Sequence, residues 1–275
     1  MLVTPLIMTI VILPLLLLLL RKFSGFYYRS IMTVVSLTIM ATYGMIAALI
    51  FPVFGYTQYI NFTVARGHYY ITKFFCGIKV VPEGLEHLEE KSPVIFVCNH
   101  QSSMDIMLFG AFYPKNTSIV AKKEIKYYPF LGWYMRLSNA IFLDRKNREN
   151  AIKEARKASE DIRRKGVNVW VFPEGTRGHE SEVTLLPFKK GPFYMAVQAN
   201  VPIVPVVIAN YSHLYNAKEK RFLSGVVRAK ILPPISTDGI KQESADIEKL
   251  ATECRRQMLE VLKEITPSET MKKKQ

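Results

Sequence analysis

The stretch VIFVCNHQSSMD, from Val94 to Asp105, joins a strand pattern to the start of a helix pattern. Val94–Cys98 is a short, wholly apolar run of the kind that forms a buried strand. The run breaks at Asn99-His100, and a helix pattern follows from Ser102 to about Tyr113. The stretch therefore predicts a strand-to-helix unit with a histidine at the carboxyl end of the strand.

Strand and helix patterns continue to alternate from Pro82 onward. Predicted strands lie at 118–121, 140–143, 167–172, 201–209 and 226–232, and predicted helices at 150–165, 193–199 and 247–265. Such alternation indicates an α/β fold with a mostly parallel sheet flanked by helices. Ligands of such sheets bind beyond the carboxyl ends of the strands, which is where His100 falls.

Two apolar segments, Met1–Leu20 and Ile31–Phe54, open the chain. Each is long enough to cross a bilayer as a helix. The first lacks the basic start and the small-residue cleavage site of a secretory signal. We therefore expect a retained, membrane-embedded helical hairpin. Residues 1–81 would contain this hairpin and an aromatic segment, residues 55–79, and residues 82–275 would form the α/β domain. The aromatic segment suits either the headgroup level of a membrane or the edge of the domain core.

The formal net charge of +14 indicates an anionic partner. No Lys/Arg run interleaved with aromatic residues marks a nucleic-acid surface, so membrane lipids are favoured. Three separated cysteines and five histidines show neither a disulfide pattern nor metal-ligand spacing, so no metal is expected. The chain ends in KKKQ, which resembles the dilysine signal of endoplasmic-reticulum membrane proteins and implies a cytosolic C-terminus.

His100 and Asp105 allow two interpretations. Ser102 and Asp105 have the spacing of a helix capping box, in which the acid bonds back to the cap amide. Alternatively, His100 is a general base and Asp105 is the acid that orients it. The sequence alone leaves both open.

A second polar cluster, PEGTR, follows the buried-strand pattern VNVWVF. Gly175 would let the backbone approach a ligand closely, and Arg177 offers a planar fork suited to phosphate. A tight turn with a surface Arg–Glu pair would explain the same residues. Lys122 and Arg145 also follow strand patterns, so they would add positive charge at the same edge of the sheet as His100.

NHQSSMD, FLDR, FPEGTR and VPIVPVV, in this order, resemble the four motif blocks of the glycerolipid acyltransferases. Within that superfamily the chain is similar to the 1-acyl-glycerol-3-phosphate acyltransferases. The likeness covers Pro82 to Ile235, and it implies that residues 82–275 are the catalytic domain. One departure is Asn139, where the family often has glycine.

The resemblance implies transfer of a fatty acyl group from acyl-CoA to the sn-2 hydroxyl of lysophosphatidic acid, at a membrane. His100 would be the base and Asp105 its partner. The implied phosphate site contains Arg177 with Gly175 and Thr176, together with Glu174, Lys122 and Arg145. Acyl-CoA would be a co-substrate, and no cofactor or obligate protein partner is implied.

Other activities remain open at this point. The acceptor could be another lysophospholipid or glycerol-3-phosphate. A thioesterase or lysophospholipase could use the same residues, with water or Cys98 as the nucleophile.

Overall fold

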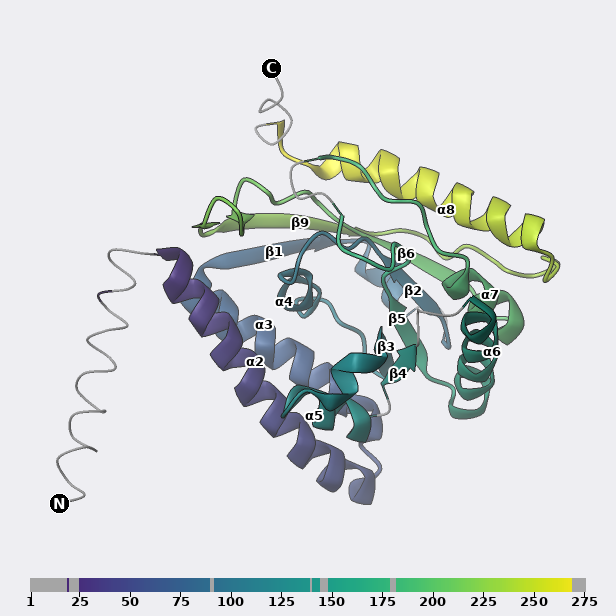
Figure 1. Cartoon of the computed structure of the whole chain (residues 1–275), viewed down its shortest axis with the longest axis horizontal. Coiled ribbons are helices and arrows are strands. Elements are labelled where there is room, and N and C mark those ends of the chain that lie inside the picture. The colour runs from purple at the N-terminus through teal and green to yellow at the C-terminus, as the bar shows by residue number, and fades with distance from the viewer. Residues whose placement is uncertain are drawn as a thin grey trace.

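The computed structural model describes residue 19 and residues 25–89, 92–138, 140–143, 148–178 and 182–268. Within these residues a seven-stranded sheet has the order β1-β9-β6-β2-β5-β3-β4, with helices on both faces (Figure 1). The strands are β1 Ile78–Glu83, β2 Ile95–Cys98, β3 Thr117–Lys122, β4 Ile141–Leu143, β5 Asn168–Val171, β6 Ile203–Ile208 and β9 Gly225–Ile231. Two short strands, β7 Tyr215–Asn216 and β8 Arg221–Phe222, pair with each other.

The helices are α2 Gly25–Ile50, α3 Ile60–Cys76, α4 Asp105–Phe109, α5 Leu131–Leu137, α6 Arg148–Lys165, α7 Gly191–Ala199 and α8 Ser244–Ile265. Four 3₁₀ turns, among the described residues, are η1 Phe51–Phe54, η2 Thr57–Tyr59, η3 Leu85–Leu88 and η4 Lys123–Tyr127. Every helix and strand expected after Val94 is present. The helix after His100 is shorter than expected, because it ends at Phe109.

The mostly parallel sheet is confirmed, with one reversal. β6, β2, β5, β3 and β4 are mutually parallel, whereas β9 pairs antiparallel with β6 and parallel with β1. One edge of the sheet therefore gathers the carboxyl ends of the five parallel strands and the amino ends of β1 and β9. This edge is called the rim below.

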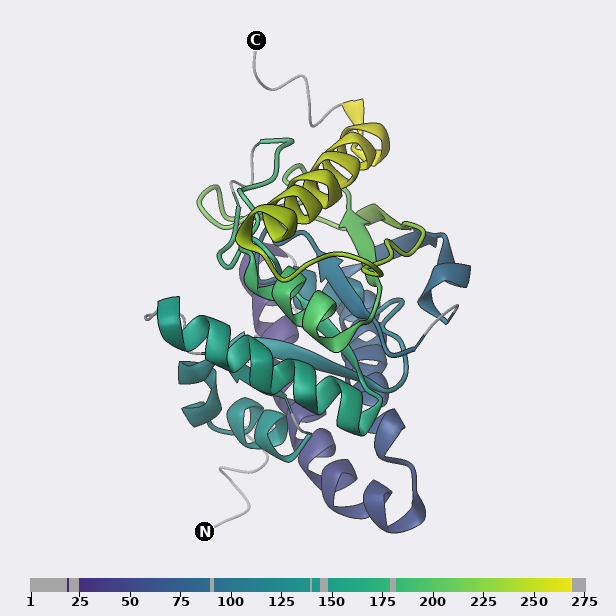
Figure 2. The same cartoon turned by 90° about the vertical axis from the view of Figure 1, so that its right-hand side faces the viewer.

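The sheet is buried on both faces, which explains why β2 reads as an unbroken apolar run. Phe96 points to the face covered by α2, α3 and α4, and Val97 points to the face covered by α6, α7 and α8. Figure 1 shows α8 above the sheet and α2 and α3 below it, and Figure 2 shows α6, α7 and α8 together on their side.

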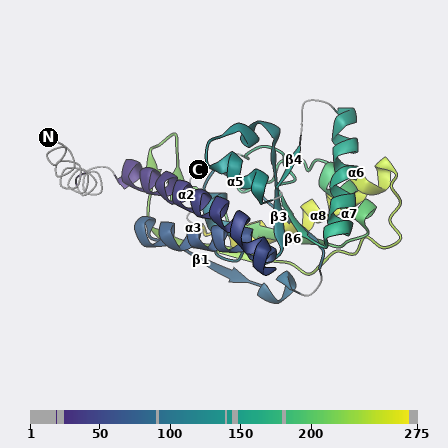
Figure 3. The ribbon, with the colours of Figure 1, turned by 90° about the horizontal axis from the view of Figure 1, so that it is seen from below.

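The expected hairpin is not confirmed. Its first segment, Met1–Leu20, lies outside the described residues apart from Leu19. The second segment is helical, and α2 with η1 is the one helix in the described part of the chain long and apolar enough to cross a membrane. In the structure α2 pairs instead with α3, the aromatic segment (Figure 3).

The pair is held by polar and steric contacts between the two helices. Ser36 Oγ lies 2.9 Å from His68 Nδ1 in a buried contact. Burial lowers the pKa of His68 to about 4, so this imidazole is neutral at pH 7. Gly67 lies so close to Met40 that a Cβ there would approach the methionine methyl to 2.4 Å. α3 also contacts α4, β1 and β3, as expected of an edge of the domain core, whereas Phe74 is 81% exposed and the place of the segment at a membrane stays a prediction.

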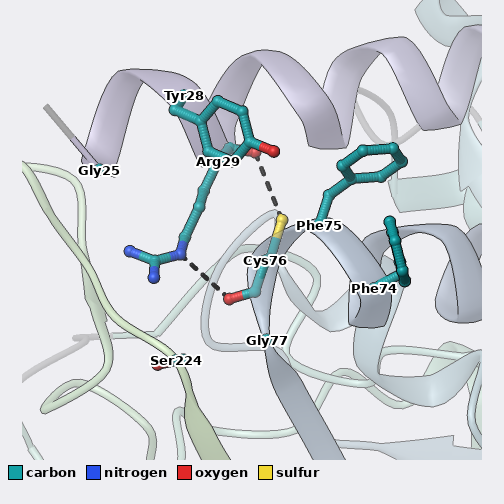
Figure 4. A pocket seen from close by; sticks show the side chains of 8 residues that line it. All are labelled: Gly25, Tyr28, Arg29, Phe74, Phe75, Cys76, Gly77 and Ser224. Atoms are coloured by element: carbon teal, nitrogen blue, oxygen red, sulfur yellow. Dashed lines mark hydrogen bonds between the residues drawn. The ribbon is translucent and has the colours of Figure 1, made fainter. Parts of the chain in front are cut away.

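Arg29 connects the start of α2 to two other elements. Its Nε donates to the carbonyl of Cys76, the last residue of α3, at 3.0 Å (Figure 4). Its Nη1 donates to the carbonyl of Phe222 in β8. The expected boundary at 81/82 falls inside β1, so α2, α3 and the sheet form one packed unit. A cavity of about 190 Å³ beside Arg29 is lined partly by Tyr28, Phe74 and Phe75.

The contact of α3 with α4 yields a stability prediction. Substitution Gly110→Ala would place a methyl group 2.3 Å from the carbonyl oxygen of Ala65, a backbone atom that cannot move aside alone. We expect a loss of about 1–3 kcal/mol and a lower Tm, at roughly 2–4 °C per kcal/mol. Thermal unfolding in detergent measures this. Gly191→Ala is the control, because it adds a methyl group to open space, and an equal Tm for both variants would contradict the prediction.

Candidate active site

Asn99 fixes the end of β2 against the neighbouring strand. Its Nδ2 donates to the carbonyl of Ile208 at 2.9 Å, and its Oδ1 accepts from the amide of the same residue at 2.8 Å. The side chain thus continues the hydrogen bonding between β2 and β6 after the ladder stops. His100, the next residue, therefore extends from an anchored position at the rim.

His100 and Asp105 form a close pair. His100 Nδ1 lies 2.8 Å from Asp105 Oδ2. The carboxylate can only accept, so Nδ1 carries the proton and donates it. The imidazole stacks on Phe172, with ring centroids 4.2 Å apart and 21° between the planes. Within the described residues Nε2 has no partner, and the side chain is 17% exposed, so this nitrogen is free to accept a proton.

Asp105 is fully buried and accepts from several donors. The backbone amides of Gln101 and Ser102 reach Oδ2 at 2.6 and 3.0 Å. The hydroxyl of Tyr211 donates to Oδ1 at 2.6 Å. The bond from the Ser102 amide is the one that the capping-box spacing predicts, although α4 begins only at Asp105, so the carboxylate holds the turn before the helix and contacts His100 at the same time. The two interpretations of this carboxylate are compatible.

Glu174 holds the backbone on which His100 stands. One carboxylate oxygen accepts from the His100 amide at 2.8 Å and the other from the Leu186 amide at 3.0 Å. The side chain is 3% exposed, and burial raises the pKa of its carboxyl. The amide of Gly178 donates to the His100 carbonyl at 2.8 Å. This contact with the backbone was not predicted from the sequence, and it adds a structural role to the place of Glu174 in the implied phosphate site.

The rest of the PEGTR turn faces outward. Gly175 has φ +71°, in the left-handed region that favours glycine. Thr176 and Arg177 are exposed, and Arg177 has no ion-pair partner in the described part of the chain. Lys122, at the end of β3, is exposed and likewise unpaired among these residues. β5 lies between β2 and β3, so Arg177 follows the strand next to that of His100, and Lys122 ends the strand after it.

The remaining sequence predictions have different outcomes. Arg145 lies outside the described residues, so its place in a phosphate site stays a prediction, and so do the substrate contacts of Arg177, Gly175, Thr176, Glu174 and Lys122. Cys98 is fully buried, and burial, followed by the charges of Asp105 and Glu174, raises the pKa of its thiol well above the ordinary value. A thiol of this kind is a poor nucleophile.

Tyr211 was missed by the sequence reading. It stands three residues beyond the end of β6, the strand next to β2. The expectation that polar side chains at the carboxyl ends of neighbouring strands lie together would have found it. It was passed over because the order of strands in the sheet is not visible in the sequence.

Comparison with known proteins identifies the family. Residues 79–209 match the family model described as Acyltransferase. The 1-acyl-sn-glycerol-3-phosphate acyltransferase of Saccharomyces cerevisiae is 41% identical over 240 residues, which cover 87% of this chain and 78% of the yeast protein. The alpha form from Homo sapiens is 39% identical over 194 residues, or 70% of this chain and 67% of the human protein.

A solved structure agrees with these matches. The crystal structure of the 1-acyl-sn-glycerophosphate (LPA) acyltransferase PlsC from Thermotoga maritima superposes with a TM-score of 0.69 at 28% identity, covering 87% of this chain and 95% of that chain. This chain therefore belongs to the 1-acyl-sn-glycerol-3-phosphate acyltransferase family, and the resemblance seen in its motifs is confirmed.

The scaffold role of Glu174 gives a prediction. In Glu174→Gln one of the two acceptor oxygens becomes an NH₂ group that faces a backbone amide, which leaves a buried donor unsatisfied at a cost of about 1–3 kcal/mol. We expect a lower Tm and, because the His100 backbone loses its anchor, a turnover lower by on the order of tenfold. Glu248→Gln on exposed α8 is the control. An intact Tm and turnover in Glu174→Gln would exclude the scaffold role.

Proposed function

We propose that this enzyme transfers a fatty acyl group from acyl-CoA to the sn-2 hydroxyl of lysophosphatidic acid, giving phosphatidic acid and CoA. The observation that carries the proposal is the His100–Asp105 pair at the rim. Its Nδ1 is engaged, its Nε2 has no partner among the described residues, and the exposed cations Arg177 and Lys122 follow neighbouring strands. The names of the yeast, human and bacterial relatives support the choice of acceptor.

His100 acts as the base for the acceptor alcohol. Nε2 takes the hydroxyl proton while the oxygen attacks the thioester carbon, and an anionic tetrahedral intermediate forms. The carbon–sulfur bond then breaks, and the imidazolium returns the proton to the CoA sulfur. Asp105 stabilises the imidazolium in between, as the acid of a Ser-His-Asp triad does. General base catalysis of this kind contributes on the order of 10² to 10⁴ in rate.

Arg177 and Lys122 bind the phosphate of the acceptor. A guanidinium forms two parallel hydrogen bonds with a phosphate, and a lysine adds a point charge. Gly175 shapes the turn that presents Thr176 and Arg177. Arg145, which follows β4 in the sequence, is a further candidate for binding this phosphate. The phosphate is thus held on the β5 and β3 side of the base.

The exposed apolar surface holds the enzyme at a membrane, where both lipid substrates reside. Within α2 and η1, an 18-residue window has a mean hydropathy of 2.1, and 28% of its residues are buried. The exposed apolar residues of this face are Tyr27, Ile31, Val34, Val35, Ile39, Tyr43, Ile46, Leu49, Ile50, Val53 and Phe54. Phe74 on α3 and Tyr127, Tyr128 and Trp133 around α5 extend the apolar surface. We assign the enzyme to the endoplasmic-reticulum membrane with a cytosolic C-terminus, from its KKKQ end, which lies outside the described residues.

The first test measures CoA release from oleoyl-CoA by membranes that contain the protein, with and without lysophosphatidic acid. We expect release that requires the acceptor, yields phosphatidic acid and falls by at least about 10² in His100→Ala. His87→Ala on η3 is the control and should retain full activity. Release without acceptor would show a hydrolase, and acceptor-dependent turnover that survives in His100→Ala would exclude this mechanism.

The second test concerns Arg177. Replacing it by alanine removes a charge-assisted contact worth about 1.5–3 kcal/mol, so the KM for lysophosphatidic acid should rise by on the order of tenfold or more. The KM for acyl-CoA should change little. Arg177→Lys should recover part of the loss because it keeps the charge but not the fork. Arg156→Ala on α6, an exposed arginine paired with Glu160, serves as the control. Equal KM values in all variants would place the phosphate elsewhere.

A further inference from the structure

We propose that Tyr211 is a positioning residue of the catalytic pair, whose hydroxyl fixes the Asp105 carboxylate so that His100 stays oriented as the base. The inference rests on the proposed function, because it assumes that His100 takes the proton of the acceptor. It assigns to the segment after β6 a part in the reaction that the histidine and aspartate motif does not contain.

The hydrogen bonds around Tyr211 have a definite direction. The phenol has one proton, and Asp105 Oδ1, at 2.6 Å, can only accept it. The hydroxyl of Ser102 lies 2.9 Å from the phenol oxygen, so Ser102 must be the donor in that contact. The Ser102 oxygen in turn accepts from the amide of Met104 at 3.0 Å. Protons thus point along one line, from Met104 through Ser102 and Tyr211 to Asp105.

The two oxygens of Asp105 have different tasks. Oδ2 accepts from His100 and from the backbone amides of Gln101 and Ser102, all of which belong to one turn of the chain. Oδ1 accepts from Tyr211, which comes from the segment after β6. A carboxylate held at one oxygen can rotate about its terminal bond, and a donor at the second oxygen prevents this rotation. The aim of Oδ2 at the imidazole therefore depends on Tyr211.

Tyr211 stands on an anchored segment. The amide of the preceding Asn210 donates to the hydroxyl of Thr266 beyond α8, and its side-chain amide donates to the carbonyl of Glu182. The Gln101 side chain, next to His100, donates to the carbonyls of Ile208 and Ala209. The tyrosine itself is 3% exposed. A buried side chain on such a scaffold does not reach substrate, so its influence must pass through Asp105.

The substitution Tyr211→Phe removes the hydroxyl and leaves the ring. One oxygen of a buried carboxylate then has no donor, so its orientation loosens and turnover should fall by on the order of tenfold. The KM values for lysophosphatidic acid and acyl-CoA should stay within about twofold, because the residue contacts neither substrate. A role confined to folding would lower Tm without this separation of kcat from KM.

The pH profile gives an independent signature. The titratable groups that face the pair are Cys98 on β2, Glu174 after β5 and Tyr211 after β6, and the substitution changes the last of these. Without the phenol, the carboxylate charge falls more fully on His100 and favours its protonated form. The acid limb of the kcat/KM profile should therefore move to higher pH.

The experiment compares wild type, Tyr211→Phe and Tyr113→Phe in the assay with lysophosphatidic acid and oleoyl-CoA. Tyr113 is an equally buried tyrosine, 3% exposed, whose hydroxyl donates to the carbonyl of Thr117. A kcat loss and an acid-limb shift confined to Tyr211→Phe support the inference. Unchanged kcat, or equal effects in both variants, would overturn it. A wild type without acceptor-dependent transfer would overturn the proposed function instead.

A second variant covers the case in which Tyr211→Phe unfolds. Ser102→Ala keeps the backbone amide that reaches Asp105 and removes the hydroxyl that donates to Tyr211. It should lower kcat in the same direction but by less. In the folded case the double variant should match Tyr211→Phe alone, because Ser102 acts through the phenol. Full activity in Ser102→Ala, or independent losses that add in the double variant, would contradict the proposed line of hydrogen bonds.

Discussion

The buried charge of Asp105 is the constraint that organises this end of the molecule. An ionised carboxylate with no exposed surface is costly unless hydrogen bonds and an opposite or incipient charge compensate for it. Its donors come from the turn after β2, from His100 and from the segment after β6. They converge because β2 and β6 pair in parallel with Cys98 opposite Val206, so β6 ends only two residues beyond the level at which β2 ends. The register of the sheet is therefore a condition of the site.

The reversal of β1 and β9 divides the rim into two halves. On one side the carboxyl ends of β2, β5 and β3 carry His100, Arg177 and Lys122 in spatial order. On the other side the amino ends of β1 and β9 meet the start of α2 through Arg29. The start of α2, the apolar helix, thus meets the same edge of the sheet that carries the base. This arrangement suits a reaction whose acceptor and product are lipids.

Local patterns in the sequence predicted most of the α/β fold and the central pair of the site. β2, β5, β6 and α8 were visible because burial and amphipathic spacing are local properties. The pairing of His100 with Asp105 was foreseen because both belong to one turn. β1 was not predicted, because Ile78–Glu83 is neither a continuous apolar run nor a strict alternation: it contains Lys79 and Pro82.

What the sequence did not reveal depends on contacts between distant segments. The antiparallel pairing of β9 with β6, the packing of α2 on α3 and the bond from Tyr211 to Asp105, 106 residues apart, arise from tertiary structure. The bonds of Glu174 to the amides of His100 and Leu186 were not predicted for the same reason. Its sequence neighbours are exposed turn residues, and only the fold shows that its carboxylate faces inward to two backbone amides.

The order of synthesis gives the contact of Arg29 a particular meaning. α2 leaves the ribosome before the sheet it packs against, and one of the two backbone acceptors of Arg29 belongs to Phe222, 193 residues further along the chain. During that interval α2 has no sheet to pack against, and its apolar face can already enter a bilayer. The membrane would receive the helix first, and the domain would then assemble onto a helix that is already in place. If α2 were replaced by another membrane-spanning helix, the chain would still be attached to the bilayer. The domain would lack the surface of α2 on which it assembles.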